Sequence, residues 1–172
     1  MNTNALIMEN EFAKDFEIAK LEDLTNFHFE EFIMVENDEL LLRLAGLLPV
    51  NIEKEFVPRY VFDIVLKSDN LKVGFLLLRA ALTEKMLRRG GHIGYGIEEI
   101  YRGHSYAAKA INLLKPFMKK TIVGKILITC DEDNLASRGT IKRIGGKLIK
   151  IEKNVDVPEE NCKKDCCYYE LI

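Results

Sequence analysis

Residues 91–110 read GHIGYGIEEIYRGHSYAAKA, and this stretch decides the fold that the chain is expected to adopt. His92–Ile97 is a partly apolar six-residue run that follows Gly90 and Gly91, and this pattern predicts a strand. After Arg102 one apolar stripe recurs at helical spacing: Ala107, Ala110, Ile111, Leu114 and Phe117 or Met118. A strand, a turn led by an arginine and a helix start gather backbone N–H groups and the positive end of a helix dipole, which is typical of a phosphate-binding loop.

Single residues refine this reading. Gly94 and Gly96 lie on one face of the predicted strand, which marks a bulge or a place where a ligand approaches the backbone. Ser105 is expected to cap the helix that follows. Pro116 predicts that this helix ends or kinks nearby.

The loop Arg102–Ala107 resembles the pyrophosphate-binding loop of the GCN5-related N-acetyltransferases (GNAT), usually written Arg/Gln-x-x-Gly-x-Gly/Ala. Arg102 and Ala107 match that pattern, whereas Ser105 stands at a glycine position. Glycine is used there because the backbone must turn tightly against a phosphate. A serine side chain at this point either crowds the phosphate or donates its hydroxyl to it.

A second motif follows at the spacing that the family requires. Lys125–Cys130 predicts a buried strand, Asn134 opens a helix that reaches about Ile144, and Gly145 and Gly146 end it. Asn134 and Ser137 resemble the family's second cofactor-side motif, and Lys147–Glu152 predicts the next strand. Gly90–Ile97, Ile128–Asp131 and Tyr168–Leu171 further resemble a subgroup of predicted bacterial acetyltransferases.

The resemblance implies one acyltransferase domain over residues 1–172 with an α/β fold. That fold has three layers: a mixed, mostly antiparallel sheet of about seven strands with helices on both faces. A parallel pair, the fourth and fifth strands, would splay to admit the cofactor. The remaining expected elements are an edge strand Phe16–Leu21, helical segments Leu24–Val35 and Glu36–Leu48, a hairpin of Tyr60–Leu66 and Leu71–Leu78, and a last strand Asp165–Ile172.

The resemblance also implies acetyl-CoA as cosubstrate and an unidentified amine as acceptor. The implied cofactor-binding residues are Ile97, Glu98, Glu99, Arg102, Gly103, His104, Ser105, Tyr106, Ala107, Asn134 and Ser137. Backbone groups of the first three would pair with the pantetheine amides like an added strand. Loop N–H groups from Gly103 to Ala107 would meet the pyrophosphate. Arg102 would shape the loop or counter its charge; the alternatives are a solvated Arg102 and an Asn134 that only caps its helix.

Proton transfer has no familiar residue in this chain. The family's usual acid, a tyrosine seven residues after the motif Asn, is replaced by Ile141, and its usual strand glutamate by about Thr129. The candidates left are His92, Tyr95, Glu98 and Glu99, or a chain of water molecules. His92 is the preferred general base because imidazole titrates near neutrality. The alternative is a structural or surface histidine, and strand parity decides between the two.

Composition excludes several functional classes. The chain has 172 residues, 48% of them hydrophobic and 30% charged, as in a soluble globular domain. A net charge of −2 gives no nucleic-acid footprint. Without an apolar run of membrane-spanning length or a signal-peptide pattern, the chain is expected to be cytoplasmic. Cys162, Cys166 and Cys167 form a cluster that is expected to hold thiols, with no metal and no disulfide.

The acceptor side is less defined. Ala80–Arg89 is a long insertion that, with Arg79, carries four basic residues beside the expected cleft. It favours an acidic acceptor or the cofactor's phosphates; the alternative is a solvated helical turn. The leading hypothesis is N-acetyl transfer by direct attack in a ternary complex. The others are a non-catalytic acyl-CoA binder or sensor and an interaction domain that uses a helix over Leu40–Leu48. The oligomeric state, including a homodimer, stays open.

Overall fold

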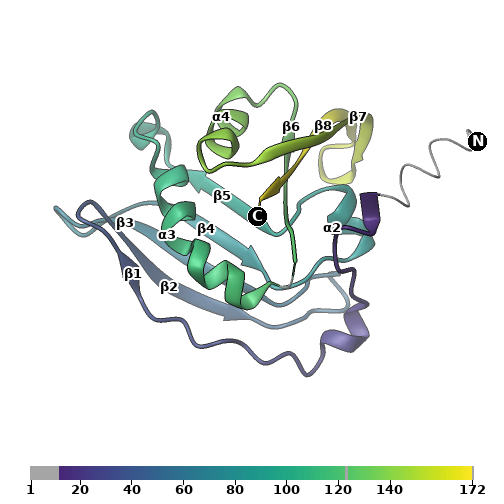
Figure 1. The fold of residues 1–172 in the computed structure, drawn as a ribbon, viewed down its shortest axis with the longest axis horizontal. Helices are drawn as coiled ribbons and strands as arrows, with labels where there is room; N and C mark the ends of the chain where they lie inside the picture. The colour runs from purple at the N-terminus through teal and green to yellow at the C-terminus, as the bar shows by residue number, and fades with distance from the viewer. Residues whose placement is uncertain (1–11, 123, 172) are drawn as a thin grey trace, which may run out of the picture.

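A computed structural model describes residues 12–122 and 124–171 of the chain (Figure 1). The expected domain start at residues 1–11 and the last residue of the expected final strand, Ile172, lie outside the described residues. No helix among those described is long and apolar enough to cross a membrane.

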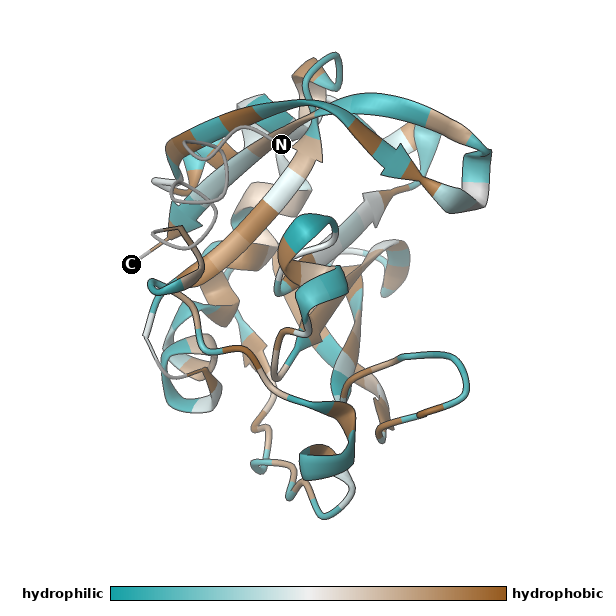
Figure 2. Ribbon diagram, turned by 90° about the vertical axis from the view of Figure 1, so that its right-hand side faces the viewer, coloured by the Kyte–Doolittle hydropathy of each residue, from teal (hydrophilic) through white to brown (hydrophobic). Residues whose placement is uncertain are grey.

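Five strands form the larger sheet: β1 (Val35–Glu36), β2 (Leu40–Leu48), β3 (Arg59–Leu66), β4 (Leu71–Arg79) and β5 (Ile93–Ile97). They pair antiparallel in sequence order, so β5 is an edge strand. Alternation explains these strands: Tyr60, Phe62 and Ile64 of β3 are fully buried at every second position. Hydrophobic segments recur along the strands (Figure 2).

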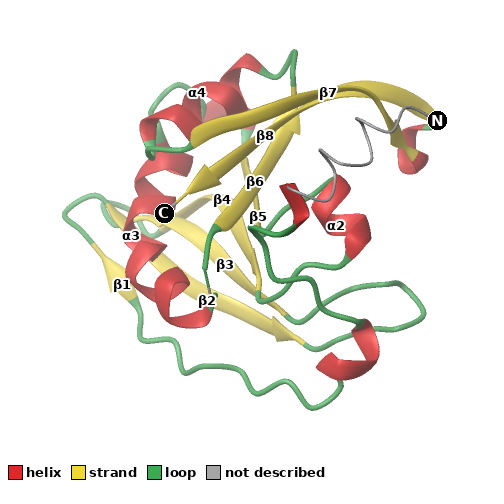
Figure 3. Cartoon of the chain, turned by 45° about the vertical axis from the view of Figure 1, so that its right-hand side comes forward, coloured by secondary structure: helices red, strands yellow, loops and turns green. Residues whose placement is uncertain are grey.

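Three strands form the smaller sheet: β6 (Ile126–Asp131), β7 (Lys147–Val157) and β8 (Cys162–Leu171). Their order is β6-β8-β7, and both pairings are antiparallel. The expected mixed α/β fold is confirmed, although the single sheet of about seven strands is divided into sheets of five and three (Figure 3). No ladder joins β5 to β6 in the described chain. One backbone hydrogen bond joins the sheets there, from His92 N–H to Leu127 O (2.8 Å).

Two longer helices position the loop and the second motif. Helix α3 (Tyr106–Thr121) packs its buried side, including Ile111, Leu114 and Phe117, on the larger sheet. Helix α3 continues past Pro116 to Thr121. The expectation that the helix ends near this proline is therefore wrong. Helix α4 (Leu135–Arg143) follows β6. The short segments are α2 (Glu84–Arg88), η1 (Leu21–Leu24), η2 (Glu99–Tyr101) and η3 (Pro158–Glu160).

The N-terminal third differs from the expectation. The predicted helices Leu24–Val35 and Glu36–Leu48 are wrong: the first region is mostly irregular and the second holds β1 and β2. Phe29 and Phe32 fix the irregular chain by ring contacts with Tyr60 and Phe62, and no periodic pattern is needed for that. The expected strand Phe16–Leu21 is reduced to a single bridge between Ile18 and Leu82.

Candidate functional site

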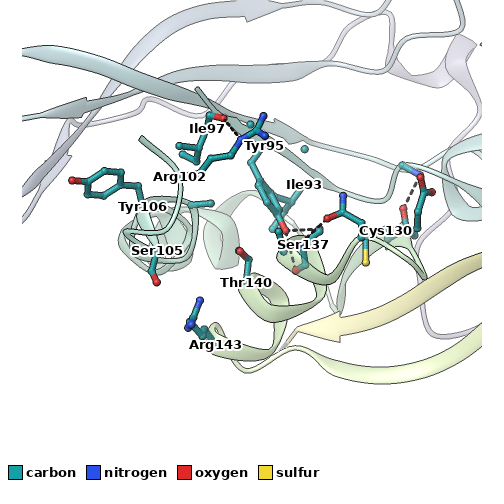
Figure 4. Close-up of a pocket in the computed structure, with 18 of the residues that line it drawn as sticks. Ile93, Tyr95, Ile97, Arg102, Ser105, Tyr106, Cys130, Ser137, Thr140 and Arg143 are labelled. Atoms are coloured by element: carbon teal, nitrogen blue, oxygen red, sulfur yellow. Dashed lines mark hydrogen bonds between the residues drawn. The ribbon is translucent and has the colours of Figure 1, made fainter. Parts of the chain in front are cut away.

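A cavity of about 700 Å³ lies between the edge of β5, the loop before α3, the end of β6 and helix α4 (Figure 4). Eight of the predicted cofactor-binding residues line it: Ile97, Arg102, Gly103, Ser105, Tyr106, Ala107, Asn134 and Ser137. The other three, Glu98, Glu99 and His104, lie next to the lining residues in sequence and are exposed. The two motifs that were recognised separately therefore share one cleft.

The free edge of β5 forms one wall of this cleft. β5 pairs with β4 on one side only, so its other edge offers backbone N–H and C=O groups to the cavity. A Cβ atom added at Gly96 would lie 2.6 Å from the ring of Phe75. The β4–β5 ladder has no bulge, and the atoms nearest to Gly96 on this face belong to Phe75 of β4. The approach of a ligand to these glycines stays a prediction.

The loop before α3 presents a run of unpaired N–H groups. In the described chain, the backbone N–H groups of residues 103–108 donate to no protein acceptor. Gly103 has φ 89° and Ser105 has φ 60°, both in the left-handed region. Ser105 precedes α3 as expected, but its side chain makes no capping hydrogen bond. The turn that the family pattern builds with glycine is thus built here with serine, and the helix N-terminus stays open to the cleft.

Arg102 holds this loop in place. Its Nε donates to the carbonyl of Ile97 (3.1 Å), which ties the loop to the end of β5, while the side chain stays exposed. The N–H of Glu98 donates to Val73 O (2.9 Å) and is engaged within the sheet. Of the two roles expected for Arg102, this hydrogen bond supports the shaping of the loop.

Helix α4 closes the cleft opposite β5. Asn134 Oδ1 accepts from the N–H of Ser137 (3.0 Å) and caps α4, so Asn134 both caps the helix and lines the cavity. The Tyr95 hydroxyl reaches across from β5 and lies 2.7 Å from Ser137 Oγ. Burial raises the pKa of Tyr95, so its phenol is protonated at neutral pH.

His92 lies outside the cavity lining and is 3% exposed. Its Nδ1 accepts from the N–H of Leu127 (2.9 Å), so the histidine joins the two sheets through its backbone and its ring. Burial and the nearby Arg79 lower its pKa to about 4. These contacts are those of a structural histidine, and the general-base role of His92 stays a prediction.

Sequence reasoning missed several lining residues on α4 and β6, among them Thr140, Arg143 and Cys130. Thr140 and Arg143 follow Ser137 at steps of three, so the three side chains share one helix face toward the cleft (Figure 4). This polar Ser-x-x-Thr-x-x-Arg spacing was the available signal. The third residue, Cys130, has no such signal, and burial raises the pKa of its thiol to about 11.

The predicted cysteine cluster holds thiols. Cys162 is exposed and Cys166 and Cys167 are buried, and all are free. Among residues 12–122 and 124–171 there is no group of three or more His, Cys, Asp or Glu side chains that could hold a metal ion.

Fold and site together define a class: an α/β protein with a helix N-terminus and a free strand edge arranged along one cleft, suited to a phosphate-bearing ligand with amide groups. The family model described as "Acetyltransferase (GNAT) domain" matches residues 16–147, which is well over half of the chain. The chain therefore belongs to the GNAT acetyltransferase family, and the resemblance drawn from the two motifs is confirmed. None of the curated proteins is significantly similar to it.

Solved structures show the same fold at low sequence identity. An acetyltransferase of the GNAT family from Bacillus anthracis is 19% identical, with a TM-score of 0.59, over 81% of this chain and 98% of that chain. RimL, a ribosomal L7/L12 α-N-protein acetyltransferase solved with coenzyme A, is 16% identical, with a TM-score of 0.61 over the same shares. The microcin C7 self-immunity acetyltransferase MccE, solved with acetyl-CoA and AMP, is 19% identical, with a TM-score of 0.53, over 66% of this chain and 61% of that chain.

Proposed function

We propose that this protein is an N-acetyltransferase that binds acetyl-CoA in the cleft and transfers the acetyl group to a primary amine. The observation that carries the proposal is the run of unpaired N–H groups at residues 103–108, next to the free edge of β5. Family membership supports it, as do the coenzyme A and acetyl-CoA in the RimL and MccE structures.

Each part of the cleft fits one part of acetyl-CoA. The N–H groups of the loop and the positive end of the α3 dipole suit the pyrophosphate. Arg143, which has no carboxylate partner among the described residues, adds a positive charge from α4. The edge of β5 suits the pantetheine amides, which would extend the sheet as an added strand. The cosubstrate supplies the activated acyl group.

The reaction needs two proton transfers. The amine nitrogen attacks the thioester carbonyl carbon and loses a proton to the base as the C–N bond forms. The C–S bond breaks, and the sulfur leaves as a thiolate that takes up a proton. Tyr95 is our candidate proton donor because its hydroxyl lies in the cleft beside Ser137. Ile141, at the family's usual tyrosine position, is fully buried, and Thr129 accepts the N–H of Gly90 (2.9 Å). The base is left to solvent, to the exposed Glu98 or Glu99, or to His92.

Calorimetric titration with acetyl-CoA, with desulfo-CoA and ADP as controls, tests the binding half of the proposal. We expect one site per chain, with ADP binding more weakly because it lacks the pantetheine arm. Absence of acetyl-CoA binding at millimolar concentration would overturn the proposal. The catalytic half is tested by thiol release from acetyl-CoA in the presence of a broad panel of primary amines.

A second candidate is a non-catalytic acyl-CoA binder or sensor, and the buried Ile141 in place of the usual acid favours it. Tight binding without turnover on any amine would select this candidate.

We also propose that residues 1–172 form one acyltransferase domain. The free cysteines support a cytoplasmic location, because disulfides are rare there.

A further inference from the structure

A second cavity, of about 310 Å³, lies where β3 begins and β4 ends, beside α2, and its polar lining is mostly cationic. The charged residues around it are Glu55, Arg59, Arg79, Lys85 and Arg89, and its apolar wall includes Phe56 and Met86. Arg79 and Arg89 also line the acetyl-CoA cleft, so the two cavities meet at these arginines.

Arg59 and Arg79 form an unusual pair. They are direct register partners on β3 and β4, so their side chains lie on the same face of the sheet. Like charges directly opposite each other destabilise a sheet. Burial, followed by the charge of Arg59, lowers the pKa of Arg79. In the described part of the chain, neither guanidinium has a carboxylate partner to offset this repulsion.

Both guanidinium groups are held in position by neutral contacts. Arg79 Nη1 donates to the carbonyls of Gly90 and Gly91 at 3.1 Å each. Arg59 lies 4.4 Å over the ring of Phe56 and donates from Nη1 to the carbonyl of Val57 (3.4 Å). The other guanidinium nitrogens of the two arginines have no acceptor among the described residues, so they remain available to a ligand with fixed geometry.

The nearby carboxylates are already paired with other cations. Glu55 lies 2.8 Å from Lys85, and Asp131 lies 2.6 Å from Arg89 and 3.3 Å from Lys164. Arg89 Nη1 is nevertheless buried without a hydrogen-bond partner. A buried donor left unpaired destabilises the folded protein. Positive charge and hydrogen-bond donors are therefore in surplus where the two cavities meet.

We propose that the Arg59–Arg79 pair binds an anionic group, a carboxylate or a phosphate, on a small amine acceptor. This rests on the proposed acetyltransferase function. The pair lies on β3 and β4 at the level of the start of β5, whereas the phosphate-binding loop follows the end of β5, roughly 13 Å away for four strand rises. The pair is thus set apart from the site for the cofactor's phosphates. The cavity volume is at the small end of the range for small-molecule sites.

Direct anion binding is the first test and needs no turnover. Succinate and inorganic phosphate would be titrated calorimetrically into the protein, free and saturated with desulfo-CoA. We expect at least one of the two to bind in both states, with the stronger ligand showing whether carboxylate or phosphate is preferred. Arg59→Gln should weaken that binding about tenfold. Arg59→Lys should weaken it less, because lysine keeps the charge but lacks the planar guanidinium that donates two parallel hydrogen bonds. Arg88 is exposed and lies outside both cavities, so Arg88→Gln should bind the anion as the wild type does.

Turnover provides the second test. γ-Aminobutyrate against butylamine, and phosphoethanolamine against ethanolamine, are matched amines that differ by the anionic group. For at least one of the two pairs, we expect kcat/KM of the anionic amine to be at least tenfold higher than that of its neutral counterpart. In Arg59→Gln this advantage should be lost through a higher KM for the anionic amine, while the Kd for acetyl-CoA is unchanged.

The outcomes separate the two proposals. Absence of anion binding, or equal binding by Arg59→Gln and Arg88→Gln, overturns the anionic-acceptor inference whatever the cofactor result. Acetyl-CoA binding that persists in Arg59→Gln shows that the variant is folded. Failure of acetyl-CoA to bind overturns the acetyltransferase proposal, and the anion titration of the free protein still reports on the pair.

Discussion

Ser105 stands in a conformation that serine rarely adopts. A left-handed backbone costs a non-glycine residue roughly 1–2 kcal/mol, and Ser105 has φ 60° at the point where the family pattern has glycine. Its hydroxyl makes no capping bond and faces the cleft that Arg143 also lines (Figure 4). We therefore favour the donating role over the crowding role for this side chain.

The first residue-scale prediction separates these two roles. Ser105→Ala keeps the Cβ and removes the hydroxyl, so it should weaken acetyl-CoA binding about fivefold, the value of roughly one hydrogen bond. Ser105→Gly should lose the same contact while raising the free energy of unfolding by about 0.5 kcal/mol, because relief of the left-handed strain outweighs the added chain entropy. Calorimetry and denaturant unfolding check both. Tighter binding by Ser105→Gly than by wild type would establish crowding instead.

Tyr95 gives the second residue-scale prediction. If its phenol protonates the leaving thiolate, Tyr95→Phe should lower kcat about 100-fold and leave the Kd for acetyl-CoA within twofold. Because burial raises the Tyr95 pKa above its ordinary 10.0, any alkaline decline of the wild-type rate that this group causes should have its midpoint above pH 10. Tyr101→Phe, another lining tyrosine, serves as the matched control. Equal kcat values for the two variants would remove Tyr95 from the mechanism.

Helix α4 carries an element-scale prediction through its polar face. Arg143 shares that face with Ser137 and Thr140, whereas the exposed Lys142 is not among the cavity residues. Arg143→Gln should weaken acetyl-CoA binding about five- to tenfold and reduce its dependence on ionic strength, because a phosphate contact is lost. Lys142→Gln removes the same charge one residue away and should bind as wild type. Equal losses in the two variants would point to a general effect of net charge.

His92 belongs to the element scale because it joins β5 to β6. Its folded pKa of about 4 lies below the ordinary 6.5, so the unfolded chain binds the proton more readily. The contribution of His92 to the free energy of unfolding should have its full value above pH 6.5. It should fall by about 3 kcal/mol as the pH decreases to about 4. His92→Asn should flatten this slope because an amide does not titrate in this pH range. The amide oxygen can still accept the Leu127 N–H, so the variant keeps that contact. Denaturant unfolding at several pH values measures the slope.

The same variant tests the predicted catalytic role of His92. Because the imidazole lies outside the cavity lining, His92→Asn should retain most acetyl transfer at pH 8. A 100-fold loss of kcat in a folded variant that still binds acetyl-CoA would establish His92 as the base.

The elements that sequence reasoning predicted well are those with local signals. Strand β5, the Arg102 loop, α3 and the start of α4 are marked by glycines, a cap and helical periodicity within a few residues of each other. The leucine-rich run of β2 is ambiguous by periodicity, and its conformation is decided by pairing with β3, whose residues lie about twenty positions later. The requirement for glycine at position 91 is likewise set by a distant residue, because a Cβ there would lie 2.5 Å from Leu127 O.

At the scale of the whole molecule, the cleft lies where two separate sheets diverge. One direct backbone hydrogen bond, the His92 ring and the Gly90–Thr129 contact hold β6 near the start of β5, and beyond them the cavity separates the sheets. A ligand that contacts both β5 and α4 should therefore stabilise the two sheets as one unit.

Hydrogen exchange measures this coupling. Acetyl-CoA at 100 times its Kd should stabilise the folded state by about 2.7 kcal/mol. It should slow exchange at residues 103–108, along β5 and in the first turn of α4. The turn of the β7–β8 hairpin at Pro158–Glu160, whose flanking strands contribute only Cys166 to the cavity lining, should change only through global stabilisation. ADP, which reaches only the loop, should protect residues 103–108 without β5. Protection confined to the loop with acetyl-CoA as well would mean that the pantetheine arm does not use the strand edge, and the free edge of β5 would then lose its place in the proposed function.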